Sequence, residues 1–233
     1  MHKRNDNSIV HSQIKPPEGK RTIVLGITGG IACGKSLISR FFEELGAVVL
    51  SADALAREAV RPGEVVFKQI VAHFGEDILT AEGAIDRAHL ARRIFLFPDE
   101  RQILNQLTHP AIARLADRRI EELRQRQGVR LIVYEAPLLF EAGREDSVDL
   151  VLVVSSDPQR QLERLMRRDN LSREEAMQRI SAQIPLAEQV ARADIVIENN
   201  GSLKETQQLV SHIYSELTGC KKKILRNRRI EKF

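Results

Sequence analysis

A glycine-rich segment near residue 30 has the composition and spacing of a phosphate-binding loop. It matches GxxxxGK[ST], in which glycines let successive backbone N–H groups turn inward around phosphate oxygens. In that pattern Lys35 would reach the β- and γ-phosphates, Ser36 would bind Mg²⁺, and the following helix N-terminus would add partial positive charge. The sequence therefore predicts a P-loop for a nucleoside triphosphate and Mg²⁺. The predicted nucleotide-binding residues are Gly29, Gly30, Ile31, Ala32, Cys33, Gly34, Lys35, Ser36 and Leu37.

The loop alone does not define a reaction, because GTPases, motor ATPases and kinases share it. A GTPase needs a guanine-reading NKxD and a switch DxxG, and neither pattern occurs in the chain. Asp53 lies 18 residues after Lys35, just past a predicted strand. There a carboxylate can orient an acceptor hydroxyl and take its proton during phosphoryl transfer. An N-cap for the helix that follows suits Asp53 equally well.

Cations near the transferring phosphate are a second requirement of phosphoryl transfer. Arg164 and Arg168 are spaced i,i+4 on one predicted helix, with Arg160 and Arg167 on the same segment, as in a mobile lid over the nucleotide. A solvated surface position is the alternative for each arginine. Glu135, which follows a predicted strand, is a candidate for holding Mg²⁺ through water, and a plain surface carboxylate is its alternative.

Five short apolar runs predict the strands of a sheet covered on both faces, at residues 21–28, 47–50, 129–134, 150–155 and 195–197. Helical patterns separate them, so the predicted fold is α/β, a doubly wound five-stranded parallel sheet of the P-loop NTPase type. Gly46 predicts the end of the first helix. Capping boxes at Ser172 and Ser202 predict the beginnings of two others.

The chain of 233 residues is long enough for one such domain, predicted at residues 21–219. An inserted helical subdomain is expected at about residues 62–127 and a helical lid at about 157–185. His109-Pro110 is interpreted as a turn between two helices of the insertion. Residues 1–20 are predicted to be a flexible leader, and residues 220–233 a basic tail.

The charge distribution argues against a nucleic-acid partner. The formal net charge is +4, but the tail carries net +6 and the leader net +2, which leaves the predicted domain mildly acidic. Two distant cysteines form no disulfide framework, and no run approaches the roughly 18 apolar residues of a membrane span. A cytoplasmic monomer that acts on small molecules is expected, without nucleic-acid or membrane partners.

Five motifs in order along the chain resemble those of the bacterial dephospho-CoA kinase family. The resemblance runs from about residue 22 to residue 212 and leaves both tails outside. It implies a parallel-sheet core with a CoA-binding subdomain and a lid, and transfer of the ATP γ-phosphate to the ribose 3′-hydroxyl of dephospho-CoA. The motifs are residues 28–36, Ala52-Asp53 with Ala56-Arg57, His109-Pro110, Pro137-Leu138-Leu139-Phe140-Glu141 and Asn199-Asn200-Gly201.

The same resemblance implies roles for individual residues. Asp53 takes the place of the family's catalytic carboxylate, Lys35, Arg164 and Arg168 act on the phosphates, and the turn Asn199, Asn200 and Gly201 lies beside the adenine. The positions implied for the acceptor are Asp53, Arg57, Arg87, Leu90, Phe95, His109, Pro110, Pro137 and Leu138.

Two departures from the family pattern keep other functions open. Ser51 stands where the family usually has a second acidic residue, which would shift metal positioning onto Glu135, and Gln189 stands where a cation is common. The alternatives are another P-loop kinase that acts on a nucleoside or nucleotide, and an ATP-binding regulator without catalysis.

Overall fold

β2 (Ile23–Gly29) is the central strand of the structure and ends at the first glycine of the P-loop. The computed structural model describes residues 7–9, 14, 19 and 21–220. The chain divides into two units, of which the first combines Met1–Val49 with Arg126–Phe233 and the second is the continuous segment Leu50–Gln125. The second unit begins earlier than the insertion predicted at residue 62.

The sheet has the order β1-β6-β5-β2-β4-β3. β2 pairs in parallel with β4 and β5, and β5 pairs in parallel with β6, as predicted. β1 runs antiparallel to β6 and lies within the predicted leader, where no strand was expected. The strands are β1 (Asn7–Ile9), β3 (Val48–Ser51), β4 (Leu131–Glu135), β5 (Leu150–Ser155) and β6 (Ile195–Asn199), besides β2.

One face of the sheet is covered by α1 (Lys35–Leu45) and α9 (Leu203–Thr218). α1 places Phe41 and Phe42 against alternate residues of the buried strands, and α9 adds Ile213 and Tyr214 to the same cluster. Apolar residues on one stripe of a helix bury that stripe against a sheet. The helix after the P-loop is therefore held firmly from its first turn, and Gly46 ends it as predicted.

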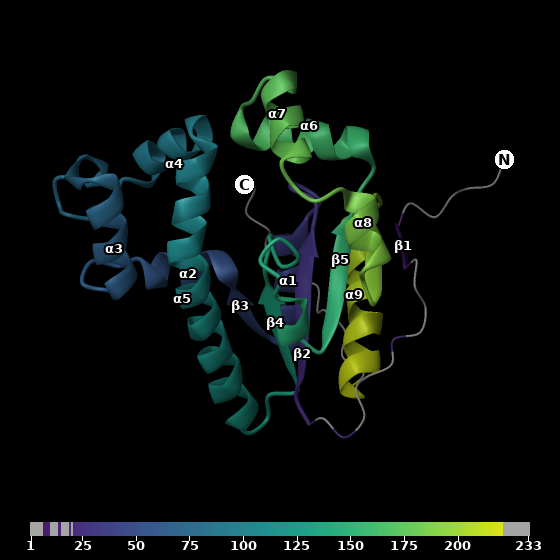
Figure 1. Ribbon diagram of the computed structural model, residues 1–233. Coiled ribbons are helices and arrows are strands. Elements are labelled where there is room, and N and C mark those ends of the chain that lie inside the picture. The colour runs from purple at the N-terminus through teal and green to yellow at the C-terminus, as the bar shows by residue number, and fades with distance from the viewer. Residues whose placement is uncertain (1–6, 10–13, 15–18, 20, 221–233) are drawn as a thin grey trace. The chain divides into compact units, whose positions relative to one another are not determined.

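Three further helices of the first unit follow β5. α6 (Pro158–Asp169) and α7 (Arg173–Ser181) form the region predicted as the lid, and α8 (Leu186–Ala191) packs near β5. Figure 1 shows α6 and α7 beyond the carboxyl end of β5, the end of the sheet at which the P-loop begins. Both predicted capping boxes are present, at Ser172 and at Ser202.

The second unit is helical and has its own core. Val66, Ile70, Phe74 and Ile78 are buried together with Leu90. Its elements are α2 (Ala52–Ala59), α3 (Val65–Phe74), the 3₁₀ helix η1 (Glu76–Ile78), α4 (Arg87–Leu96) and α5 (Pro98–Gln125).

Arg93 joins three elements of this unit. Its guanidinium donates to both carboxylate oxygens of Glu100 at 2.7 and 2.9 Å and to the carbonyl of Phe74 at 2.7 Å. It also lies over the Phe74 ring, with 5.3 Å from Cζ to the ring centroid. A planar guanidinium can bond several elements at once because it offers several donors at fixed angles.

The predicted turn at His109-Pro110 is wrong. Both residues lie inside α5, which continues for 28 residues and carries Pro110 in its interior. Proline removes one helical hydrogen bond, and for that reason its presence predicts that a helix ends nearby. Packing of α5 against α2, α3 and α4 stabilises the helix across this position.

Most of the predicted leader and residues 221–233 of the predicted tail lie outside the described residues. Within residues 21–220, no helix combines the length and the apolar content that crossing a membrane requires. Another 3₁₀ helix, η2 (Glu145–Ser147), precedes β5.

Candidate active site

The P-loop connects β2 to α1 through backbone conformations that few residues adopt. Gly29 has φ 134°, Ala32 has φ 59° and Gly34 has φ 102°. Lys35 Nζ donates to the carbonyls of Gly29 and Gly30, both at 2.9 Å, so the ammonium lies over the first turn of the loop. The backbone of the loop thus holds the ammonium group of Lys35, which was predicted to bind phosphate.

Gly29 is required by the sheet. A Cβ at this position would lie 2.2 Å from the carbonyl oxygen of Val154, the residue that it opposes in β5. Real side chains do not approach backbone so closely, and the positive φ disfavours them further. Glycine here lets the strand and the loop turn at the same residue.

Ser36 and Glu135 meet at the carboxyl end of β4. The Ser36 hydroxyl donates to Glu135 Oε1 at 2.6 Å, and both were predicted to bind the metal. Among the described residues, no group of three or more His, Cys, Asp or Glu side chains could hold a metal ion. A hydroxyl and one carboxylate suit Mg²⁺, which prefers oxygen ligands and usually takes the remainder from phosphates and water.

The back of the loop is braced by buried polar groups. Asn199 donates from Nδ2 to the Cys33 carbonyl at 2.9 Å and accepts from Thr206 of α9 at 3.1 Å. Its amide therefore links β6, α9 and the loop, a role the sequence did not reveal. The Ser156 hydroxyl lies 3.3 Å from Cys33 Sγ, and burial raises the pKa of the Cys33 thiol, which keeps it protonated.

Two of the predicted lid arginines hold the turn that follows β6. Arg164 Nη2 donates to the Asn199 carbonyl at 3.2 Å, and Arg160 donates to the Asn200 carbonyl. Asn200 in turn accepts from the backbone N–H of Asp157, the N-cap of α6, at 2.7 Å. The structure thus brings the start of the predicted lid and the predicted adenine turn together.

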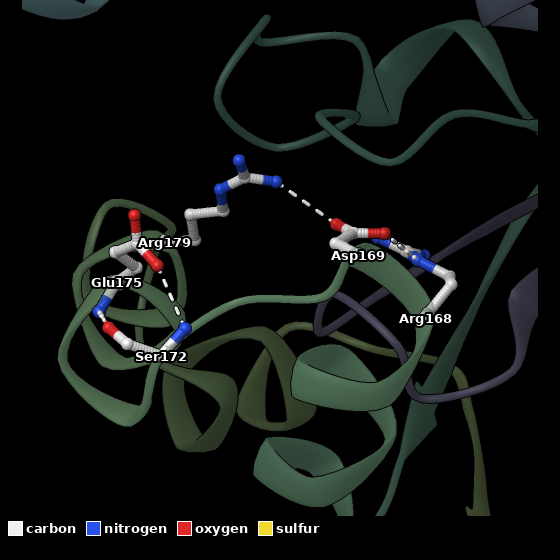
Figure 2. Close-up of polar contacts among 5 residues, drawn as sticks. All are labelled: Arg168, Asp169, Ser172, Glu175 and Arg179. Atoms are coloured by element: carbon white, nitrogen blue, oxygen red, sulfur yellow. Dashed lines mark hydrogen bonds and ion pairs between the residues drawn. The ribbon is translucent and has the colours of Figure 1, made fainter.

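Arg168 has a different partner. Figure 2 shows Asp169 between Arg168 and Arg179, with bonds of 2.7 and 3.0 Å to the first and 3.0 Å to the second. The hydrogen bond from Arg168 is the main cause that lowers the pKa of the Asp169 carboxyl. Beside this ion pair, the Ser172–Glu175 capping box fixes the beginning of α7. The network orients Arg168 at the junction of α6 and α7.

Asp53 is an exposed residue in the first turn of α2. It is not the N-cap, because Ser51 takes that position and accepts from the Ala54 N–H at 3.3 Å. The serine that departs from the family pattern thus has a structural role. The capping alternative for Asp53 is excluded, which leaves its carboxylate available for the predicted chemistry.

The other acceptor residues predicted in the second unit differ in exposure. Leu90 is buried in the core of that unit, whereas Arg57 and Arg87 are exposed on α2 and α4. His109 is half-buried, and burial lowers the pKa of its imidazole. Phe95 belongs to α4 and Pro110 to α5.

In the first unit, Pro137 and Leu138 follow β4, with Leu138 exposed. The Thr28 hydroxyl donates to the Pro137 carbonyl at 3.3 Å and holds this turn against the end of β2. Gln189, the second departure from the family pattern, is buried in α8, and its Nε2 donates to the Ile184 carbonyl at 2.9 Å. It supports the turn before α8.

Comparison with known proteins agrees with this geometry. The family model described as dephospho-CoA kinase matches residues 23–205. A dephospho-CoA kinase of Geobacter sulfurreducens is 51% identical over 193 residues, which cover 83% of this chain and 98% of that protein. The chain belongs to the dephospho-CoA kinase family. Members of this family are kinases, so the chain is a transferase that binds nucleotide through its P-loop.

Solved structures share the fold of this chain. A Thermus thermophilus protein aligns with a TM-score of 0.71 at 34% identity, over 86% of this chain and 100% of that chain. The dephospho-CoA kinase of Campylobacter jejuni aligns with a TM-score of 0.66 at 29% identity, over 84% and 97% of the two chains. The predicted P-loop NTPase fold is confirmed.

Proposed function

We propose that this kinase transfers the γ-phosphoryl group of ATP to the ribose 3′-hydroxyl of dephospho-CoA, which gives coenzyme A and ADP. The observation that carries the proposal is the family match over residues 23–205 together with a formed P-loop at the end of β2. The reaction is the last step of coenzyme A synthesis.

In this mechanism the chain positions both substrates and compensates charge. The loop amides and Lys35 hold the phosphates, while Arg164 and Arg168 offset the charge that spreads over the transferring group. Asp53 orients the 3′-hydroxyl and accepts its proton as the oxygen attacks phosphorus. The proton then resides on the Asp53 carboxylate, and the leaving ADP stays bound to the loop.

Ser36 and Glu135 would hold Mg²⁺, directly or through water. Their 2.6 Å hydrogen bond brings two oxygen donors to one point, which fits the ligand preference of this ion. When bound, the ion neutralises charge on the β- and γ-phosphates. Glu135 is the carboxylate of this pair, and Ser51, which stands where the family usually has an acidic residue, caps α2.

The acceptor is the point that an assay must decide. The rate of ADP release by the purified chain is to be measured with each acceptor in turn. The acceptors to compare are dephospho-CoA, AMP, GMP, CMP and nucleosides. We expect turnover with dephospho-CoA to exceed that with every other acceptor. Preference for a nucleoside or a nucleoside monophosphate would overturn the proposal, and tight ATP binding without turnover would indicate a regulator.

We further propose that the kinase acts as a cytoplasmic monomer on small molecules, without nucleic-acid or membrane partners. Both cysteines, Cys33 and Cys220, are free, as expected of a protein in a reducing compartment. The mass in solution, measured by sedimentation equilibrium, is expected to equal the 26.4 kDa of one chain. A mass of two chains would contradict the monomer.

A further inference from the structure

The backbone N–H and the backbone carbonyl of Ile31, inside the P-loop, are each hydrogen-bonded to a glutamine side chain. Gln183 Oε1 accepts from the Ile31 N–H at 2.7 Å, and Gln161 Nε2 donates to the Ile31 carbonyl at 3.0 Å. Because a backbone N–H can only donate and a backbone carbonyl can only accept, Gln183 must present its amide oxygen to Ile31 and Gln161 its amide nitrogen. Gln161 belongs to α6, and Gln183 lies two residues after α7.

Apolar contacts join the same parts of the chain. Leu162, Leu165 and Ala176 form a buried cluster between α6 and α7, and the side chains of Ile31 and Ala32 pack against it. The first half of the P-loop thus shares a core with the lid. A shared core makes two segments move together, because packed side chains resist separation.

Gly30 supplies the space that this arrangement needs. A Cβ on Gly30 would lie 2.6 Å from Gln161 Nε2 and 2.8 Å from Cys33 Sγ. The P-loop pattern allows any residue at this position. A glycine here is explained by the glutamine that must pass close to the backbone to reach Ile31.

The loop needs such support at its next residue. Ala32 has φ 59°, a left-handed conformation that costs a non-glycine residue free energy. Conformations of this kind persist when the surrounding structure determines them. The hydrogen bonds on the two peptide groups before Ala32 and the packing of the Ala32 side chain provide that determination.

We propose that Gln161 and Gln183 are positioning residues that fasten the lid to the P-loop and fix the two peptide groups on either side of Ile31 for phosphoryl transfer. They act through the loop backbone and contact no reacting atom. Fixed loop dipoles serve transition-state charge better than mobile ones, so the glutamines contribute to kcat more than to acceptor binding. The inference rests on the proposed kinase reaction for its kinetic readout.

A matched pair of substitutions tests the proposal. Gln161→Glu and Gln183→Glu make the same change in charge and shape at the two backbone polar groups of one residue, Ile31. At position 183 the carboxylate still accepts from the Ile31 N–H, whereas at position 161 it faces a carbonyl oxygen and donates nothing. The added negative charge affects ATP binding in both variants. A difference in rate between the two variants therefore reports whether the side chain can still make its hydrogen bond to Ile31.

We expect kcat of Gln161→Glu to fall at least about tenfold below that of Gln183→Glu, with the KM for dephospho-CoA unchanged in both. Gln178→Glu, an exposed position on α7, is the charge control and should match the unmodified enzyme. Equal kcat values for the two variants would overturn the proposal. An unmodified enzyme without turnover on dephospho-CoA would instead refute the proposed function.

A second measurement is independent of activity. Gln183→Met keeps a side chain of similar length and removes the acceptor, so the Ile31 amide should exchange its hydrogen with solvent at least about tenfold faster in NMR experiments. Gln161→Met should change that amide less, because its donor serves the carbonyl. Unchanged exchange in a folded Gln183→Met variant would overturn the proposal, even if a Glu variant fails to fold.

Discussion

The Ser36 hydroxyl donates a 2.6 Å hydrogen bond to Glu135, a residue 99 positions away in the sequence. The bond joins the first turn of α1 to the last residue of β4. The strand pairing of β2 with β4 sets this distance, because Ile27 lies opposite Glu135 in the parallel register. The sheet itself thus places a carboxylate beside the P-loop hydroxyl.

Glu135→Gln should weaken the response to Mg²⁺. The amide keeps the size of the side chain and removes its charge, so the Mg²⁺ concentration for half-maximal rate is expected to rise about tenfold. Activity is to be titrated with Mg²⁺ at saturating ATP. Glu216→Gln, which changes an exposed carboxylate of α9, should leave the titration unchanged. Unchanged Mg²⁺ dependence in Glu135→Gln would assign the metal to other ligands.

Lys35→Ala should remove most turnover. The ammonium is buried at the loop, where it donates to two carbonyls, and its loss removes a cation from the developing phosphate charge. We expect kcat to fall on the order of 100-fold or more. Steady-state rates check this, with Lys204→Ala on the exposed start of α9 as the control. A variant within a few-fold of normal kcat would contradict the role.

Asp53→Asn should lower the rate and keep nucleotide binding. The amide cannot accept the acceptor proton, so kcat is expected to fall about 100-fold or more. The ADP dissociation constant, from calorimetry, should change less than about twofold. Ser51→Ala is the matched control, because it removes the α2 cap and should cost about 1 kcal/mol of stability without a comparable loss of kcat. An active Asp53→Asn enzyme would exclude Asp53 as the base.

Asp169→Asn should reduce stability in a pH-dependent way. Arg168 lowers the pKa of the Asp169 carboxyl, so the ionised group stabilises the fold above its unfolded-state pKa of about 4. This stabilisation is lost as the pH falls through the lowered pKa of the folded state. The variant is expected to melt about 1 to 3 °C below the unmodified protein near neutral pH.

Melting curves from neutral pH to the acid limit of the folded state check the Asp169 prediction. The difference in Tm should shrink as the pH falls below the unfolded-state pKa. Glu174→Gln, an exposed acidic residue in the first turn of α7, serves as the control for lost charge. A difference in Tm that does not vary with pH would show that the ion pair with Arg168 is not its cause.

Much of the nucleotide site was predictable, because its signals are local in the sequence. The P-loop pattern, the apolar run of β2 and the glycine that ends α1 lie within residues 21–46, and the structure has each where expected. Ser172 and Ser202 likewise predict helix starts through a residue three positions on. Interactions between residues that are close in the sequence determine such features.

Features that depend on distant partners were not predictable. The hydrogen bond between Ile31 and Gln183 spans 152 positions, and no local pattern marks either residue for it. Pro110 carries a strong local signal for a helix end, yet tertiary packing continues α5 across it. β1 is three residues long and polar at its start, so its pairing with β6 had no periodic signal.

The insertion of Leu50–Gln125 into the first unit determines the order in which the sheet can form. β2 has two neighbours, β4 and β5, and both follow the inserted unit in the chain. At a synthesis rate of about 5 to 20 residues per second, several seconds therefore pass between the synthesis of β2 and that of the first strand that pairs with it. The central strand of the enzyme is the first of the parallel strands to be made, and the helical unit is complete before β2 gains a neighbour.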